Sequence, residues 1–124
     1  MTRRGGMHTI LLLALTTLVA CGEIEGPTHG IDEQTSRAAV PQDPELAKIY
    51  NRSCRNCHTV AATRAPLTGD TAAWSALMDK GMDVLVANVV NGIGGMPPFG
   101  LCMSCDADDF EALIRFMAAD PPEP

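Results

Sequence analysis

The chain has 124 residues, with 9 Lys and Arg against 15 Asp and Glu, and its formal net charge at pH 7 is −6. So acidic a surface disfavours nucleic-acid binding, because affinity for nucleic acid comes from Lys and Arg contacts to phosphate. It suits a protein partner with a basic docking patch, since charge mainly sets the rate and orientation of encounter.

The first 20 residues have the pattern of an export signal. Arg3 and Arg4 precede the apolar run ILLLALTTLVA at 10–20, which is too short to span a bilayer, because a spanning helix needs about 20 residues. A basic start followed by a short apolar run is typical of a secretory signal peptide. We therefore expect a signal peptide at 1–20; a buried core helix is the alternative.

The end of this run, LVAC at 18–21, resembles a bacterial lipobox. The resemblance implies cleavage before Cys21 and a diacylglycerol on the Cys21 sulfur. Such a lipid would anchor the chain to a membrane without a spanning segment. We therefore expect an exported, periplasm-facing lipoprotein of a bacterium. An ordinary cleaved signal, with Cys21 left as a free thiol, is the alternative.

Residues 21–42 contain few large apolar side chains and many Gly, Thr, Glu, Gln and Ser residues. This composition predicts a flexible tether. A flexible segment of about 20 residues has an r.m.s. reach of about 25 Å. A partner would therefore have to be bound to, or close to, the same membrane.

The folded part is predicted to be an all-α domain at 43–120, followed by a short tail at 121–124. Helix-start signals and apolar periodicity predict about four short helices, at 43–53, 71–80, 83–91 and 106–119. Long loops at 59–69 and 92–105 separate them, and loops of this length usually serve a site. A domain this small buries a marginal core, which suggests that something other than side chains fills its middle.

The segment CRNCH at 54–58 matches the attachment pattern of c-type haem, C-x-x-C-H. The thiols of Cys54 and Cys57 can each add across a vinyl group of the porphyrin, and the two-residue spacing lets one backbone reach both vinyls. His58, directly after the second thiol, can then turn its imidazole under the iron as an axial ligand. The predicted cofactor is one covalently attached haem c.

Two other uses of these cysteines remain open. Cys54 and Cys57 could form a redox disulfide, although that motif normally follows a strand in a βαβ unit, and no such strand is predicted. Together with Cys102 and Cys105 they could form a Cys₄ zinc site, because both pairs have the internal spacing that zinc sites use. The 44 residues between the pairs exceed the usual spacing of a zinc finger.

The sixth iron ligand is predicted to be Met96, because His/Met ligation raises the potential of an electron-transfer haem. Met96 lies in the loop NGIGGMPPFG, whose glycines allow the backbone to approach a porphyrin closely and whose prolines stiffen the loop. The other downstream methionines are weaker candidates: Met78, Met82, Met103 and Met117.

The chain as a whole resembles a class I cytochrome c, and most closely the bacterial cytochrome c5 group. The stretch that carries the resemblance runs from about Tyr50 to Met117. Its motifs are CRNCH, RAPLTGD at 64–70, Trp74, KGMDVL at 80–85, NG at 91–92, MPPFG at 96–100 and CMSC at 102–105.

The resemblance implies helices wrapped round the haem, with Tyr50 packing near Leu113 and Phe116. It implies Met96 as sixth ligand and a disulfide between Cys102 and Cys105. A second haem at CMSCD is excluded, because Asp106 stands where a histidine would be needed. By the same analogy the Pro66 region supplies a carbonyl to the ligand histidine, Arg64 or Lys80 faces the haem propionates, and Trp74 packs along the haem edge.

The predicted function is electron transfer by a monohaem cytochrome, and not catalysis. Two axial ligands leave no open iron site for oxygen or substrate. A haem-based sensor or ligand-binding module with a labile Met96 is the first alternative. A small zinc-stapled structural lipoprotein is the second.

Overall fold

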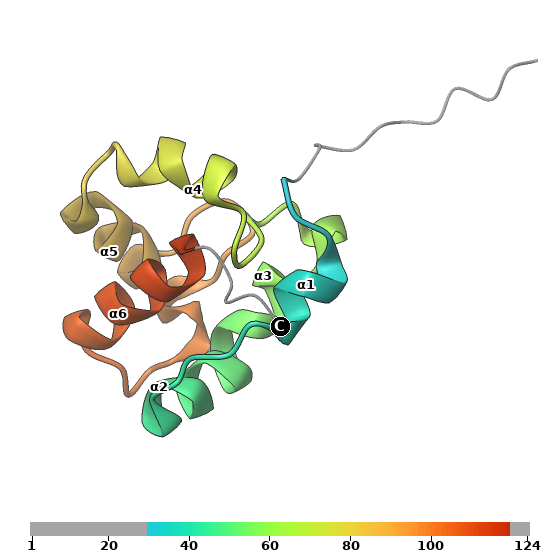
Figure 1. The fold of residues 1–124 in the computed structure, drawn as a ribbon. Helices are drawn as coiled ribbons and strands as arrows, with labels where there is room; N and C mark the ends of the chain where they lie inside the picture. Colours follow the sequence, from blue (N-terminus) through green and yellow to red (C-terminus); the bar gives the residue numbers. More distant parts are fainter. Residues whose placement is uncertain (1–29, 120–124) are drawn as a thin grey trace, which may run out of the picture.

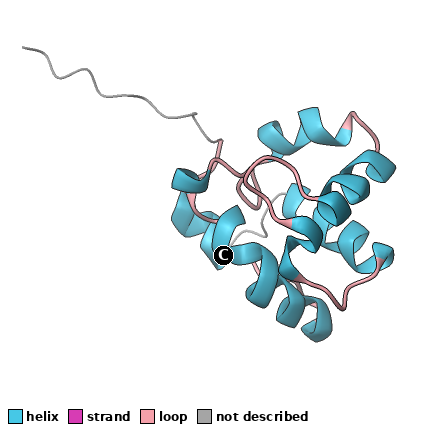
Figure 2. Cartoon of the chain, turned by 180° about the vertical axis from the view of Figure 1, so that it is seen from behind, coloured by secondary structure: helices cyan, strands magenta, loops and turns pink. Residues whose placement is uncertain are grey.

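Helices and loops make up the part of the chain that the structure, a computed structural model, describes: residues 30–119 (Figure 1). The predicted signal peptide at 1–20, the predicted lipidation site Cys21 and the predicted tail at 121–124 lie outside these residues. Within residues 30–119 there is no strand, only an isolated bridge between Ile93 and Met96 (Figure 2). The predicted all-α fold class is confirmed.

The elements follow one another in the order α1 (Glu33–Ala38), α2 (Pro44–Ile49), η1 (Tyr50–Cys54), α3 (Arg55–His58), η2 (Ala61–Thr63), α4 (Thr71–Met78), α5 (Met82–Asn91), η3 (Pro98–Leu101) and α6 (Ala107–Ala118). Of these, α2, η1 and α3 run on without a break, with η1 as a π-helical turn between two α-helical segments. No helix of residues 30–119 is long and apolar enough to cross a membrane.

Aspartates begin three of the helices that the sequence predicts, α2, α4 and α6. The Asp43 carboxylate accepts from the backbone N–H groups of α2, and Pro44 occupies the first helical position. Asp70 accepts from Ala73 N at the start of α4. Asp106 and Asp109 form a reciprocal capping box at the start of α6. Each carboxylate satisfies a backbone donor that has no partner inside the helix.

The core lies where α6 packs against α2, α4 and α5. Its buried members come from four elements of the chain: Tyr50, Trp74, Leu85, Leu113, Ile114 and Met117. Tyr50 meets Phe116 edge to face, with ring centroids 5.0 Å apart. The predicted packing of Tyr50 against the last helix is therefore confirmed, and it brings the segment that leads into CRNCH against α6.

The predicted flexible tether at 21–42 is wrong for residues 30–42. These residues include α1, and the side chains of Ser36 and Ala39 are 0% and 4% exposed. Figure 1 shows α1 beside α3. Polar composition suggested a solvated segment, but backbone groups of α3 and of the loop after it give α1 hydrogen-bond partners. The folded domain therefore includes residues 30–42 as well as the predicted domain from residue 43 onward.

Candidate haem-binding site

Cys54, Cys57 and His58 lie on the continuous helical segment that ends with α3. Cys54 is half-buried and Cys57 is exposed, and both are free thiols in the structure. Burial, followed by repulsion from Cys57, raises the pKa of Cys54 to about 11. Both sulfurs come from one helical turn, which suits bonds to one edge of a flat ring.

His58 ends α3, and its imidazole is buried, with 7% of its surface exposed. Its Nδ1 lies 2.8 Å from the Pro66 carbonyl oxygen. Because a carbonyl only accepts, Nδ1 carries the proton and Nε2 is the nitrogen left to bind a metal. Burial lowers the pKa of His58, against the opposing effect of the Pro66 hydrogen bond, so the ring is neutral at pH 7, as a metal ligand must be.

The segment that holds the histidine ring, residues 66–68, is itself fixed from three directions. Trp74 Nε1 donates to the Leu67 carbonyl at 2.8 Å, and Thr68 N donates to the His58 carbonyl at 2.7 Å. The Tyr50 hydroxyl donates to Thr68 Oγ1 at 2.9 Å. The Pro66 carbonyl is therefore set in place by contacts to η1, α3 and α4. The Trp74 ring also lies near the His58 ring, with centroids 5.8 Å apart.

Met96 lies in the loop between α5 and η3, and its backbone exchanges two hydrogen bonds with Ile93. The glycines at 92 and 100 make room for it. A Cβ on Gly92 would come within 2.8 Å of the Met96 carbonyl oxygen, and one on Gly100 within 3.3 Å of the Met96 methyl carbon. Gly92 is thus required by the close packing of the loop backbone around Met96, and Gly100 leaves space for the Met96 methyl group.

The other methionines are placed differently. Met117 is buried in the core and Met103 is 74% exposed. Met78 and Met82 are partly buried and pack against the core cluster. Of the five candidates, Met96 is the one that lies in a tight, glycine-lined loop.

The zinc alternative does not agree with the structure. Cys102 and Cys105 are joined in a disulfide, and a disulfide sulfur is not a thiolate ligand. Within residues 30–119, no group of three or more His, Cys, Asp or Glu side chains could hold a metal ion. The four cysteines of the two CxxC pairs therefore do not meet at one site.

Comparisons with known proteins agree on a family. Residues 41–117 match the family model described as "Cytochrome C oxidase, cbb3-type, subunit III". Cytochrome c5 of Ectopseudomonas mendocina is 38% identical over 72 residues, which is 56% of this chain and 83% of that protein. Cytochrome c5 of Azotobacter vinelandii is 39% identical over 72 residues, 56% of this chain and 87% of that protein. The chain is a class I c-type cytochrome of the c5 group.

A solved structure supports the same fold for this cytochrome. It is titled "Crystal structure of electron transfer complex of nitrite reductase with cytochrome c". The matched chain is 35% identical, with a TM-score of 0.54, and the match covers 63% of this chain and 95% of that one. As a c-type cytochrome, the protein takes part in electron transfer and carries covalently attached haem c.

The residues of this cytochrome fit that cofactor. Cys54 and Cys57 supply the two thiols of the attachment pattern from one turn of helix, and His58 is held neutral with Nε2 available. Apolar side chains that are only partly buried, among them Met82, Val86 and Val89, adjoin the core cluster. An apolar surface of this kind suits a porphyrin.

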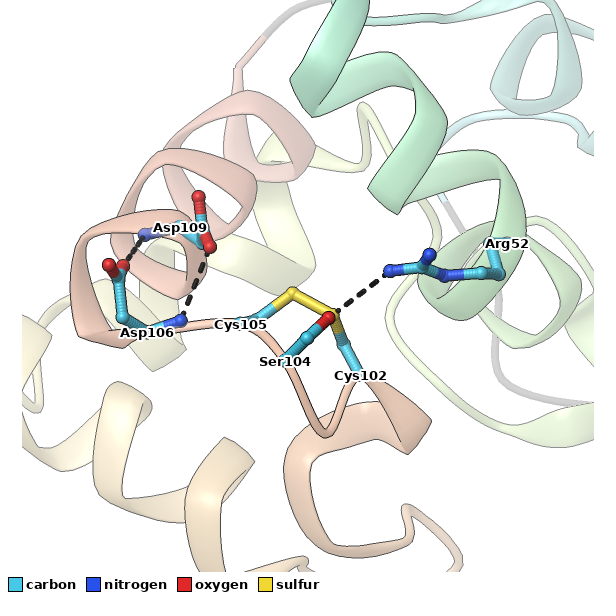
Figure 3. Close-up of a disulfide and its surroundings, with 6 residues drawn as sticks. All are labelled: Arg52, Cys102, Ser104, Cys105, Asp106 and Asp109. Atoms are coloured by element: carbon cyan, nitrogen blue, oxygen red, sulfur yellow. Dashed lines mark hydrogen bonds between the residues drawn. A yellow bond between two sulfur atoms is a disulfide. The ribbon is translucent and has the colours of Figure 1, made fainter.

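The Cys102–Cys105 disulfide lies between the Met96 loop and α6 (Figure 3). Arg52, on η1, donates from Nη2 to Cys102 Sγ at 3.4 Å. On the other side of the bridge, Asp106 begins α6 immediately after Cys105. The disulfide thus shapes the turn that leads from the loop of Met96 into the last helix, beside the segment that carries Cys54.

Three residues named from the family analogy are placed as follows. Trp74 is buried in the core and bonds to the Leu67 carbonyl, and its packing along the haem edge stays a prediction. Arg64 and Lys80 are exposed. No ion pair is recorded for either among residues 30–119, and a role toward the haem propionates stays a prediction for both.

Two α1 side chains that bond to the haem-attachment segment or to the residues just after it were not predicted, those of Ser36 and Glu33. Ser36 Oγ donates to the His58 carbonyl at 3.3 Å, and Glu33 Oε1 accepts from Ala61 N at 2.6 Å. The sequence does contain a signal for this helix. Asp32 is a good N-cap, and Glu33 and Arg37 form an i, i+4 pair.

Proposed function

We propose that this cytochrome carries single electrons, with the haem iron bound between His58 Nε2 and Met96 Sδ and with the porphyrin bonded to Cys54 and Cys57. The observation that carries the proposal is the 2.8 Å contact between His58 Nδ1 and the Pro66 carbonyl. It favours a neutral ring in a fixed orientation, with Nε2 as the metal-binding atom. The tight loop around Met96 supports the second ligand.

Two protein ligands suit a carrier for a physical reason. An iron that keeps both ligands changes little between its oxidised and reduced forms, so little rearrangement accompanies each electron. It also has no open position for oxygen or a substrate. A thioether ligand opposite histidine raises the midpoint potential of the haem. The polypeptide contributes by excluding water and by holding both ligand side chains in place.

Replacing Met96 by Ala tests the ligation directly. We expect the Met96→Ala protein to keep its haem on a denaturing gel, because the thioether bonds remain. The midpoint potential should fall, the sulfur-to-iron charge-transfer band of the ferric protein should disappear, and the reduced protein should bind carbon monoxide. Met103→Ala is the matched control, since Met103 is 74% exposed, and it should resemble the unmutated protein.

The same measurements separate the carrier from a haem-based sensor. An unmutated protein that lacks the charge-transfer band and binds carbon monoxide rapidly would favour the sensor. A Met96→Ala spectrum identical to that of the unmutated protein would move the sixth ligand elsewhere. Haem lost on the denaturing gel would contradict covalent attachment itself.

We further propose that the chain is exported and held at a membrane by a lipid on Cys21. The signal-like run at 1–20 and the lipobox-like LVAC support this. Residues 21–29 stand in the sequence between the proposed anchor and the described domain. A chain of about nine residues spans at most about 30 Å even when fully extended. The donor and acceptor would therefore work close to the same membrane surface.

The partner that these features fit is a redox protein with a basic docking patch. The chain is strongly acidic, and opposite charge speeds encounter and orients the two proteins. The matched structure, a cytochrome c in an electron transfer complex with nitrite reductase, supports a protein as the partner.

A further inference from the structure

Residues 30–40, here called the N-terminal strap, lie before the segment that matches the family model, which starts at residue 41. The strap contains α1, and it is packed against the domain by the buried side chains of Ser36 and Ala39. Its contacts are concentrated on the haem-attachment segment and on the residues that follow it.

Three hydrogen bonds join α1 to this segment. The Arg55 guanidinium donates to the Arg37 carbonyl, Ser36 Oγ donates to the His58 carbonyl at 3.3 Å, and Ala61 N donates to Glu33 Oε1 at 2.6 Å. They fall before, at and after His58. A fourth bond, from Gly30 N to Asp70 Oδ2 at 3.2 Å, fixes the start of the strap to the N-terminus of α4.

The bond from Ser36 gives the His58 carbonyl its second hydrogen-bond donor. The ring of His58 is held by the Pro66 carbonyl, and its own carbonyl accepts from Thr68 N at 2.7 Å as well as from Ser36. A carbonyl has two lone pairs, so both acceptor positions are used. The strap therefore provides a bond to the ligand residue from outside the 41–117 segment.

We propose that the N-terminal strap fixes the backbone on both sides of the axial histidine, with Ser36 and Glu33 as positioning residues of the haem site. The inference rests on the proposed ligation by His58. Loosening the strap would let the backbone at 58–61 move and admit water beside the ligand. Greater solvent access favours the more highly charged ferric iron and lowers the potential, because the shell around a metal site controls its redox potential.

The first test is amide hydrogen exchange by NMR on the reduced holoprotein. In Glu33→Ala the Ala61 amide loses a charged acceptor and should exchange about ten- to a hundredfold faster. Glu33→Gln keeps an acceptor oxygen and should restore most of the protection. In Ser36→Ala the His58 carbonyl loses one of its two donors. The Thr68 amide, which donates to the same carbonyl, should exchange about two- to tenfold faster as this backbone loosens. Gln34→Ala, at an exposed position of the same helix, is the matched control.

The second test uses the haem as its reporter. In Glu33→Ala and Ser36→Ala, the midpoint potential should fall and the low-spin ferric EPR spectrum, which reports the axial imidazole, should shift or broaden. Glu33→Gln and Gln34→Ala should change neither. A fall in thermal stability with an unchanged potential and EPR spectrum would show that the strap only stabilises the fold, and would overturn the proposal.

Failure of this inference differs from failure of the proposed function. If His58 were not an axial ligand, the unmutated protein would lack the low-spin histidine signature before any change to the strap. If the strap had no positioning role, the unmutated protein would show that signature, and all four variants would match it in potential and EPR spectrum.

Discussion

Tyr50 shows how one side chain can serve both the core and the haem site. Its ring is fully buried and packs edge to face on Phe116 of α6. Its hydroxyl donates to Thr68 Oγ1, and Thr68 N in turn bonds to the His58 carbonyl. Burial of the phenol raises its pKa, with the hydrogen bond to Thr68 as the largest opposing effect. Tyr50 therefore links the contact between η1 and α6 to the position of residues 66–68.

The raised pKa of Tyr50 predicts a loss of stability at high pH. The phenol ionises near its usual pKa of 10.0 in the unfolded chain but at a higher pH in the folded one. Between these values the unfolded state binds fewer protons, so the free energy of unfolding falls as pH rises. Tyr50→Phe should cost about 1 kcal/mol at pH 7, through the lost hydrogen bond, and should weaken this decline above pH 10. Guanidinium unfolding, monitored by far-UV circular dichroism at several pH values from 7 to 11, measures the cost at pH 7 and the decline above pH 10.

Thr68→Val is the matched control for this prediction, because it removes the acceptor but leaves the buried phenol. Its stability should still decline above pH 10. A decline that is equally steep in Tyr50→Phe and in the unmutated protein would show that another group titrates.

At the residue scale, the sequence predicts well what depends on short spacing. Cys54, Cys57 and His58 lie within five residues, so a single helical turn brings them together whatever the rest of the chain does. The contact of Pro66 with His58 could be expected only by analogy with the family, because the two residues are eight positions apart along the chain. The contact of Ser36 with His58 spans 22 residues, and no local pattern predicts which carbonyl a serine will meet.

The loop between α5 and η3 is an element whose shape depends on glycine. Gly92 has φ 76° and ψ 154°, a backbone conformation that is essentially restricted to glycine. Its missing side chain also leaves space for the Met96 carbonyl and for Pro98 N, each within 3.0 Å of where a Cβ would lie. Gly94 and Gly95 lie further along the same loop, and no atom lies within 4 Å of where a Cβ on either would be.

Gly92→Ala should therefore disturb the loop and Gly95→Ala should not. We expect Gly92→Ala to lose about 1–3 kcal/mol of stability from backbone strain alone and to weaken the charge-transfer band of the ferric protein. Nothing lies within 4 Å of a Cβ on Gly95, so that variant should stay within about 0.5 kcal/mol of the unmutated protein. Thermal unfolding and the ferric absorption spectrum check both; equal behaviour of the two variants would contradict the argument.

The helices show the same division between local and distant causes. The starts of α2, α4 and α6 could be predicted because an aspartate cap acts within three residues. The six residues of α1 make too few internal hydrogen bonds to be stable alone, since short helices depend on tertiary packing. The composition of this segment therefore predicted a flexible tether. It is helical in the structure because α1 makes hydrogen bonds to residues 55–61, which local sequence patterns do not reveal.

On the scale of the whole molecule, the strap would limit how far the domain could move from a membrane under the proposed lipid anchor at Cys21. A tether of residues 21–42 would let the haem domain search a wide volume. With residues 30–40 packed on the domain, residues 21–29 stand in the sequence between the proposed anchor and the described domain. The side of the domain that carries α1 and α3 would then be the side nearest the anchor, and a redox partner would have to reach the haem from another side.

The anchor is tested by replacing Cys21 with Ser in the full-length chain, expressed in a bacterium that matures c-type cytochromes. Because the thiol is the predicted attachment atom for the lipid, Cys21→Ser should move the haem-stained band from the membrane fraction to the soluble periplasmic fraction, or leave the signal peptide uncleaved, as seen by mass spectrometry. A double Cys102→Ala, Cys105→Ala variant removes two other sulfurs but not this one, and its haem-stained band should stay with the membranes. A cleaved Cys21→Ser protein that remained membrane-bound at the unmutated level would contradict the lipid anchor.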